Sequence, residues 1–253
     1  MTSLVQSARK GLFVPIAFFF VACGILVSLG AWQLHRLAWK ETLIEEIATR
    51  SKAPPQPLPD PASWPQLAAN DYAYRHVRLT GTFENDDEAH VFYGTGPHEL
   101  GPGYLIFTPL RLRSGAIVIV NRGFVPASLA AQSTRAKGEL SGEVTLAGLM
   151  RPPEERNLFT PADEPDKNLY FSRDPAPIAA HFHLSQVAPF IVDADPAPVP
   201  GGWPIGGMTQ IDIPNNHLSY ALTWFGLAVG LVATFAGWLR ARMVEQRGEM
   251  VNR

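Results

Sequence analysis

The amino-acid sequence predicts a membrane protein in which a hairpin of two transmembrane helices carries an antiparallel β-rich (α+β) domain outside the cytoplasm. Two long uncharged stretches, residues 11–34 and 218–239, predict the helices. Between them prolines are dense, and polar and apolar residues alternate over short segments, which favours short strands over long helices. The single cysteine, Cys23, excludes an intrachain disulfide and a cysteine-based metal site.

Residues 11–34 predict the first transmembrane helix because they contain no charged side chain. The stretch is longer than the roughly 20 residues that cross the hydrocarbon core of a membrane. It is also longer than the apolar region of a cleaved signal peptide, about 7–15 residues, and no clean small-residue cleavage site follows it. We therefore expect a retained helix. The tail before it, residues 1–10, is short for a mitochondrial transit peptide.

Two segments lead from the first span into the outer domain, residues 35–217. Residues 35–51 lack proline and glycine and predict a helix that continues the first span outward. Residues 54–65 hold six prolines, a density typical of an extended, polyproline-like connector.

Short strands are expected to form most of the outer domain. Residues 76–83 (HVRLTGTF) alternate polar and apolar side chains, which is typical of a half-buried strand. Similar patterns or continuous apolar runs predict further strands at residues 88–93, 104–113, 116–120, 143–150, 168–171 and 189–193. Asn121, Arg122 and Gly123 are turn-forming residues after the strand at 116–120.

Two short helices are predicted in the same domain. Pro126 is favourable at the start of a helix that extends to Ser133. Asp174 is a favourable N-cap and Pro175 a favourable first helical residue, which predicts a helix to about His181.

Residues 218–239 predict the second span, again without a charged side chain. Small residues lie one turn apart in both spans, Gly24 with Ser28 and Gly226 with Gly230. Such pairs are expected to let the two helices approach closely.

The basic residues predict the orientation of the chain. Six of the 21 Lys and Arg residues, but only two of the 23 Asp and Glu residues, lie in the tails at 1–10 and 240–253. Positive-inside asymmetry therefore places both tails in the cytoplasm and residues 35–217 outside. With the short N-terminal tail, this favours a bacterial inner membrane and a periplasmic domain. A pI near 6.4 gives no reason to expect a nucleic-acid partner.

Catalytic motifs are absent from the sequence, so we expect no enzyme activity. There is no G-x-S-x-G, H-E-x-x-H, Walker A, G-x-G-x-x-G or C-x-x-C-H pattern. Cys23 lies within the first span, which excludes a copper relay built on paired thiolates outside the membrane. His181 and His183 form at most an incomplete metal site, and His76, His90 and His98 are scattered.

His217 differs from the other histidines because it lies at the outer end of the second span, after Asn215 and Asn216, which can cap the helix. On a helix it shares a face with Tyr220 and Trp224. An imidazole beside an aromatic stripe can hold an iron porphyrin by one axial bond. A simple interfacial anchor is the alternative.

Residues 214–225 (PNNHLSYALTWF) resemble the hallmark of the Surfeit locus 1 family of cytochrome oxidase assembly factors. The resemblance runs from about Gly30 to Ala228. Further matching segments follow in the same order at residues 30–40, 77–83, 120–126, 168–174 and 200–204. Phe124 stands where the family more usually has tryptophan.

The resemblance implies an assembly factor, or chaperone, for haem–copper cytochrome c oxidase in the respiratory chain. It implies action while haem a enters the catalytic subunit, with that subunit, the lipid bilayer and a haem a biosynthetic enzyme as partners. It also implies that His217 is the haem ligand. Tyr220 and Trp224, which share its helical face, are expected to lie beside the ring. Two other functions stay open: a pure scaffold that never binds haem, and, less favoured, an anchored periplasmic enzyme.

Four more residues are secondary candidates. Arg36 lies one turn beyond Trp32, where an anchor to lipid headgroups is the alternative. Asn121 and Arg122 are candidates with simple turn formation as the alternative. Trp203 follows two glycines, and it is interpreted as an exposed contact or as a plug over the β domain.

Overall fold

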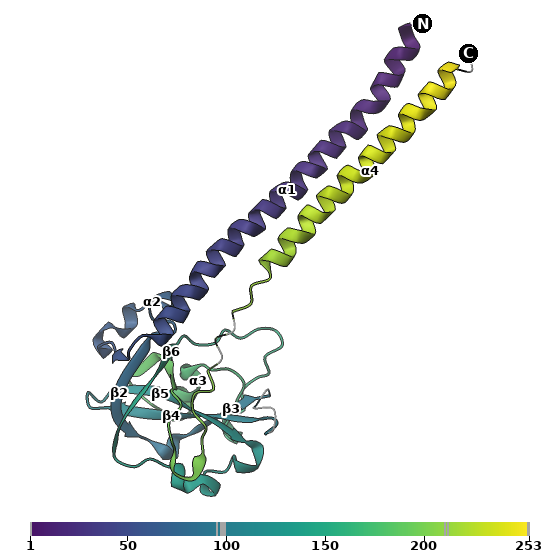
Figure 1. Cartoon of the computed structure of the whole chain (residues 1–253). Helices are drawn as coiled ribbons and strands as arrows, with labels where there is room; N and C mark the ends of the chain where they lie inside the picture. Colours follow the sequence, from purple (N-terminus) through teal and green to yellow (C-terminus); the bar gives the residue numbers. More distant parts are fainter. Residues whose placement is uncertain (1, 95, 97–99, 210, 212, 252–253) are drawn as a thin grey trace. The chain divides into compact units, whose positions relative to one another are not determined.

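The structure is a computed structural model that describes residues 2–94, 96, 100–209, 211 and 213–251 (Figure 1). It consists of two compact units. One comprises residues 1–45 and 212–253, and the other comprises residues 46–211.

The first unit is a hairpin of two long helices, α1 (Thr2–Lys52) and α4 (His217–Val251), which run antiparallel to each other (Figure 1). Each contains a stretch long and apolar enough to cross a membrane. Almost no side chain in these stretches is buried within the chain, as expected of helices that contact lipid. The predicted helical continuation beyond the first apolar stretch is confirmed, because α1 continues to Lys52.

Aromatic rings and one glycine form the contact between the two helices. The rings of Phe19 and Phe235 stack with their centroids 4.1 Å apart. A Cβ atom at Gly30 would lie 2.6 Å from Cε1 of Phe225, so only glycine allows this approach without a shift. On α4, the buried Ala221 belongs to the same face.

The expected close approach through small-residue pairs was wrong. No atom lies within 4 Å of the position that a Cβ would take at Gly24, Gly226 or Gly230. These glycines lie on outer faces of the hairpin, because the contact face passes through Gly30 and Ala221 instead.

The second unit is a five-stranded barrel with three additional strands at its margins. The barrel strands follow the order β2–β6–β8–β5–β4, and β4 pairs with β2 to close the ring. They are β2 (His76–Phe83), β4 (Gly103–Leu112), β5 (Ile117–Pro126), β6 (Glu143–Arg151) and β8 (Val187–Ala194). The additional strands are β1 (Gln56–Pro57) beside β2, β3 (Ala89–Tyr93) beside β4, and β7 (Leu169–Tyr170) beside β3.

The predicted β-rich character is confirmed, but the sheet is mixed rather than wholly antiparallel. Five neighbours in a closed ring cannot all alternate in direction, so at least one pair must be parallel. That pair is β5–β8. The marginal pairs β1–β2 and β3–β7 are parallel as well.

Alternating side chains fill two apolar clusters. The first includes inward-facing residues of the barrel: Val77, Leu79, Val118, Val120, Met150, Phe190 and Val192. The second lies against β3 and α3 (Pro175–His181): Ala89, Val91, Phe107, Phe124, Tyr170 and Ile178. The Asp174 side chain caps α3 by accepting a hydrogen bond from Ala176 N, as predicted.

The proline-rich segment at 54–65 is not uniformly extended. It contributes β1 and the start of a 3₁₀ helix, η1 (Pro61–Gln66), capped by Asp60. Trp64 explains the ordered turn, because its ring is buried and its Nε1 donates to Pro59 O over 3.0 Å. A four-residue helix, α2 (Ala69–Tyr72), follows and was not predicted.

The predicted turn at Asn121, Arg122 and Gly123 was wrong, because β5 continues through these residues. Gly123 has a φ of +123°, and the register with β4 shifts between Ile106 and Phe107. The glycine therefore lets the strand distort without ending. The predicted helix at 126–133 is replaced by two 3₁₀ segments, η3 (Ala127–Leu129) and η4 (Gln132–Gly138).

Candidate functional site

His217 begins α4 and contacts a polar side chain of α1. Its Nδ1 lies 2.7 Å from Oε1 of Gln33. Asn216 precedes the helix, and its backbone carbonyl accepts a hydrogen bond from Tyr220 N over 3.2 Å. The helix start and the α1 contact together fix where the imidazole lies.

The Gln33 contact makes the two ring nitrogens of His217 different. A carbonyl oxygen only accepts hydrogen bonds, so Nδ1 donates to Oε1 of Gln33 in this arrangement. In a neutral imidazole with this bond, the lone pair is on Nε2. Histidines that bind metals commonly have this arrangement, with one nitrogen donating to a carbonyl or carboxylate and the other free to ligate.

Trp224 and Tyr220 are not equivalent neighbours. Trp224 is half-buried, and its buried Nε1 has no hydrogen-bond partner among the described residues. Tyr220 is 55% exposed. The predicted aromatic stripe is therefore divided, with the indole near the contact face of α4 and the phenol outside it.

This donor set fits a porphyrin better than a bare metal ion. No group of three His, Cys, Asp or Glu side chains that could bind an ion occurs in the part of the chain that was described. A porphyrin supplies four equatorial nitrogens itself, so a single imidazole is sufficient. The buried, unpaired indole N–H of Trp224 adds a donor for a polar substituent.

Arg36 lies one helical turn from Gln33 on α1. Its guanidinium lies 4.3 Å from the centroid of the Trp39 ring. A cation stacked on an indole suits an anionic group, whether a lipid phosphate or a carboxylate.

Asn121 has a structural environment inside the barrel. Its Nδ2 donates to Asp193 Oδ1 over 2.8 Å, and its Oδ1 accepts from Gly123 N over 3.1 Å. Asp193 also accepts from Thr209 Oγ1 over 2.8 Å. These bonds link β5, β8 and the segment after β8, and they use both polar atoms of the Asn121 amide.

Arg122 is buried at one end of a cavity in the barrel. Its guanidinium donates to Asn85 Oδ1 over 3.3 Å and to Gly138 O, and lies 4.8 Å from the centroid of the Phe83 ring. Burial lowers the pKa of this guanidinium from its ordinary value. Trp203, by contrast, is half-buried and packs on the second apolar cluster, which agrees with the interpretation as a plug.

Three histidines of the barrel unit have local contacts. His76 faces Asp195 Oδ2 and Ala53 O, each at 2.7 Å. His90 lies 2.9 Å from Glu88 Oε1. His181 stacks edge-to-face on Phe182, and His98 lies outside the described residues.

Sequence reasoning did not identify a buried ion pair between Glu88 and Arg135. Arg135 Nη1 donates to Glu88 Oε2 over 2.8 Å, and both side chains are buried. Burial raises the pKa of Glu88, but hydrogen bonds from His90 and Arg135 lower it by more than burial raises it. The pKa of Glu88 is therefore below its ordinary value. Charged residues separated by 47 positions give no local signal in the sequence.

The fold defines the chain as a β-barrel protein with two helices that are long and apolar enough to cross a membrane. The model of the SURF1 family matches residues 20–229. The chain belongs to the SURF1 family.

Relatives support this assignment over most of the chain. Surfeit locus protein 1 of Xenopus tropicalis is 35% identical over 232 residues, which cover 85% of this chain and 70% of the relative. The human protein of the same name is 36% identical over 217 residues, with 79% and 69% covered. A SURF1-like protein of Monosiga brevicollis is 33% identical over 259 residues, with 95% and 92% covered. The resemblance seen in the sequence is confirmed.

Proposed function

We propose that this protein is an assembly factor for haem–copper cytochrome c oxidase that holds haem a through His217 during delivery to the catalytic subunit. The single observation that carries the proposal is the 2.7 Å contact between His217 Nδ1 and Gln33 Oε1. With Nδ1 donating to Gln33, a neutral imidazole has its lone pair on Nε2, where a metal can bind. Membership of the SURF1 family supports the wider role.

The helix hairpin has suitable properties for this cargo. Haem a is a flat apolar molecule, so transfer through water would be unfavourable. Haem a would supply an iron atom that binds a nitrogen ligand. His217 would provide that nitrogen, Gln33 orients the imidazole, and the Trp224 indole N–H would be the donor for a polar substituent. Arg36 attracts the carboxylates.

A site that offers one imidazole would also permit release of the haem. The other histidine of the described hairpin, His35 on α1, is exposed, and Tyr220 is exposed rather than packed. The acceptor subunit could therefore supply its own ligands to a group that this chain would hold through one residue. The chain itself makes or breaks no covalent bond in this scheme, so the proposal assigns it no enzyme activity.

The proposal places the protein in a bacterial inner membrane with both tails in the cytoplasm. The basic tails support this orientation. The start of α1 and the end of α4 lie at the same end of the hairpin (Figure 1). The barrel then lies in the periplasm, where it is available to the oxidase subunit and to a haem a biosynthetic enzyme.

Deletion of the gene tests the assembly role. In a strain with no second family member, we expect oxidase activity and membrane haem a to fall, and wild-type protein to restore both. His217→Ala is expected to restore less than a matched His181→Ala variant, because His181 lies in the barrel unit. Unchanged oxidase activity and haem a after deletion would contradict the proposal.

A pure scaffold that never binds haem is the second candidate. The observation that favours it is a cavity lined only by residues of the barrel unit, which could bind a partner protein without haem. Haem a bound to the purified protein would exclude this second candidate.

A further inference from the structure

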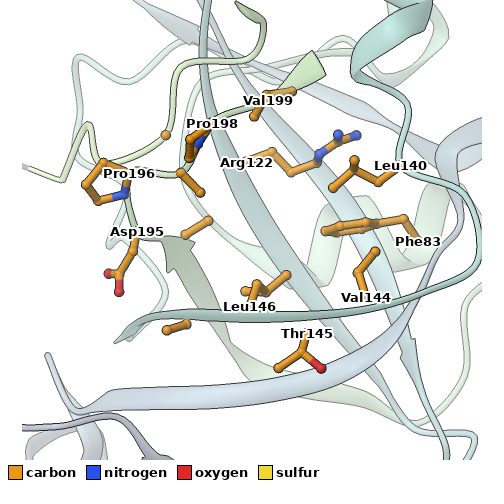
Figure 2. A pocket seen from close by; sticks show the side chains of 14 residues that line it. Phe83, Arg122, Leu140, Val144, Thr145, Leu146, Asp195, Pro196, Pro198 and Val199 are labelled. Carbon is orange, nitrogen blue, oxygen red and sulfur yellow. The ribbon is translucent and has the colours of Figure 1, made fainter.

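A cavity of about 600 Å³ lies between β6 and the segment that follows β8 (Figure 2). Apolar side chains form most of its walls. They are Phe83, Leu140, Val144 and Leu146 on one side and Pro196, Pro198 and Val199 on the other. Pro196 and Pro198 are exposed, so the cavity opens at the surface of the barrel.

The cavity exists because β8 stops pairing with β6. The last paired residues are Gly148 and Ala194, followed by one hydrogen bond from Asp195 N to Ala147 O at 3.0 Å. Pro196 and Pro198 have no N–H group and cannot extend the ladder. The first part of β6, residues 143–147, therefore has β2 on one side and no strand on the other.

Thr145 presents its backbone to this open side. In an antiparallel pair, the N–H and C=O groups of alternate residues point to opposite sides of the strand. Ala147 O points away from β2, since it accepts from Asp195 N, so the backbone groups of Thr145 point the same way. Its side chain meets Thr80 Oγ1 at 2.8 Å, outside the cavity, whereas Val144 and Leu146 point inward (Figure 2).

Arg122 supplies a buried cation at one end of the cavity, with Glu139 and Glu88 close enough to favour its charged form. Two neutral oxygens, from Asn85 and Gly138, accept its hydrogen bonds, although a guanidinium has five N–H groups. Within the described residues, no carboxylate forms an ion pair with Arg122, and the nearby Asp195 is instead paired with His76. Figure 2 shows the guanidinium above the Phe83 ring.

We propose that this groove binds an extended peptide segment of a partner protein, which adds to β6 as a strand at Thr145. One aliphatic side chain of the segment enters the cavity between Val144 and Leu146, and an acidic side chain pairs with Arg122. A free acyl chain would fill the cavity and reach Arg122, but it would leave the Thr145 N–H and C=O unpaired. The proposal does not depend on haem binding at His217.

The test uses the full chain in detergent and a panel of fluorescein-labelled hexapeptides. Each peptide alternates threonine with an aliphatic residue and carries one glutamate, and a matching panel carries glutamine instead. Fluorescence anisotropy measures the dissociation constants. We expect the glutamate peptides to bind about tenfold more tightly, because a charge-assisted hydrogen bond is stronger than a neutral one.

Two variants at Thr145 separate strand addition from other binding. Thr145→Pro removes the N–H on the open side without removing a bond to β2, because that N–H points away from β2. Thr145→Val keeps the N–H and loses only the hydroxyl contact with Thr80. We expect Thr145→Pro to bind about fivefold to tenfold more weakly than Thr145→Val, as for the loss of a backbone hydrogen bond.

Arg122→Gln tests the anion preference, which should disappear in that variant. Melting curves establish whether each variant is folded. If Arg122→Gln does not fold, the comparison of Thr145→Pro with Thr145→Val still tests the proposal. Equal binding by the two Thr145 variants, or no binding across the panel, would overturn the proposal. Laurate that competes with the peptides but binds both Thr145 variants equally would assign the groove to an acyl chain instead.

Discussion

Replacing Gln33 by leucine removes the acceptor that fixes the His217 imidazole. Leucine is similar in size and is favourable within an apolar helix, so the perturbation is confined to the 2.7 Å contact. Without the acceptor, the proton can move to Nε2, and the ring is free to rotate. Both changes remove the lone pair from the position where iron would bind.

The magnitude follows from the role of the contact. As a hydrogen bond between membrane helices it contributes about 0.6 kcal/mol on average, too little to unfold the hairpin. As the partner of a metal-binding histidine, its loss typically weakens metal affinity about 10–100-fold, or about 1.4–2.8 kcal/mol. The expected result is therefore a protein with intact helices and much weaker haem a binding.

Haem a titration into the detergent-solubilised protein, followed by absorption spectroscopy, measures this effect. Gln33→Glu is the matched control, because a carboxylate still accepts from Nδ1 and makes the imidazole a stronger donor to iron. It should retain haem a and lower the midpoint potential. If Gln33→Leu binds haem a as tightly as the wild type while His217→Ala does not, the argument from the Gln33 contact is refuted.

Three further predictions concern the fold. Glu88→Gln breaks the buried pair with Arg135 and should reduce the free energy of unfolding by about 3 kcal/mol. Because the pKa of Glu88 is lowered in the folded state, the wild type should keep this contribution above about pH 4.5 and lose it on acidification. Urea titrations should show no such loss in the variant. Burial raises the pKa of Tyr170 to about 12, and its buried hydroxyl has no partner among the described residues. The free energy of unfolding should therefore fall as pH rises above about 10. Alkaline melting curves of Tyr170→Phe should lack this fall, and a variant that retains it would contradict the assignment. Gly30→Leu forces a Cβ to within 2.6 Å of Phe225 and should destabilise the helix hairpin by about 1–3 kcal/mol, measured by thermal denaturation in detergent against Gly24→Leu, which meets open space; equal effects of the two would contradict the packing.

The sequence was most informative where a local pattern is compatible with only one type of secondary structure. Alternation at residues 76–83 and the capped helix at 175–181 were predicted within one or two residues. The turn at Asn121–Gly123 was wrong because turn propensity is local, whereas pairing with both β4 and β8 keeps β5 extended. The predicted antiparallel character holds for most strand pairs, but the parallel pair β5–β8 could not be predicted, because strand number and closure are properties of the whole domain.

The candidate site shows the same division. His217 was found from its position at the start of an apolar helix and from a family resemblance. Gln33 was not found, although it lies in the segment that carried part of that resemblance, because the partner of a side chain 184 positions away cannot be read from spacing. Arg122 was identified as a candidate, but its burial above Phe83 emerged only from the closed barrel.

The absorption spectrum of the protein purified from its own membranes, with haem a synthesis active, tests the central claim most directly. The wild type is expected to show bound haem a, and His217→Ala, prepared in parallel, is expected to have lost it while keeping the same helix content by circular dichroism. The same haem a spectrum and stoichiometry in both proteins would show that His217 is not the ligand and would contradict the proposed function of the hairpin.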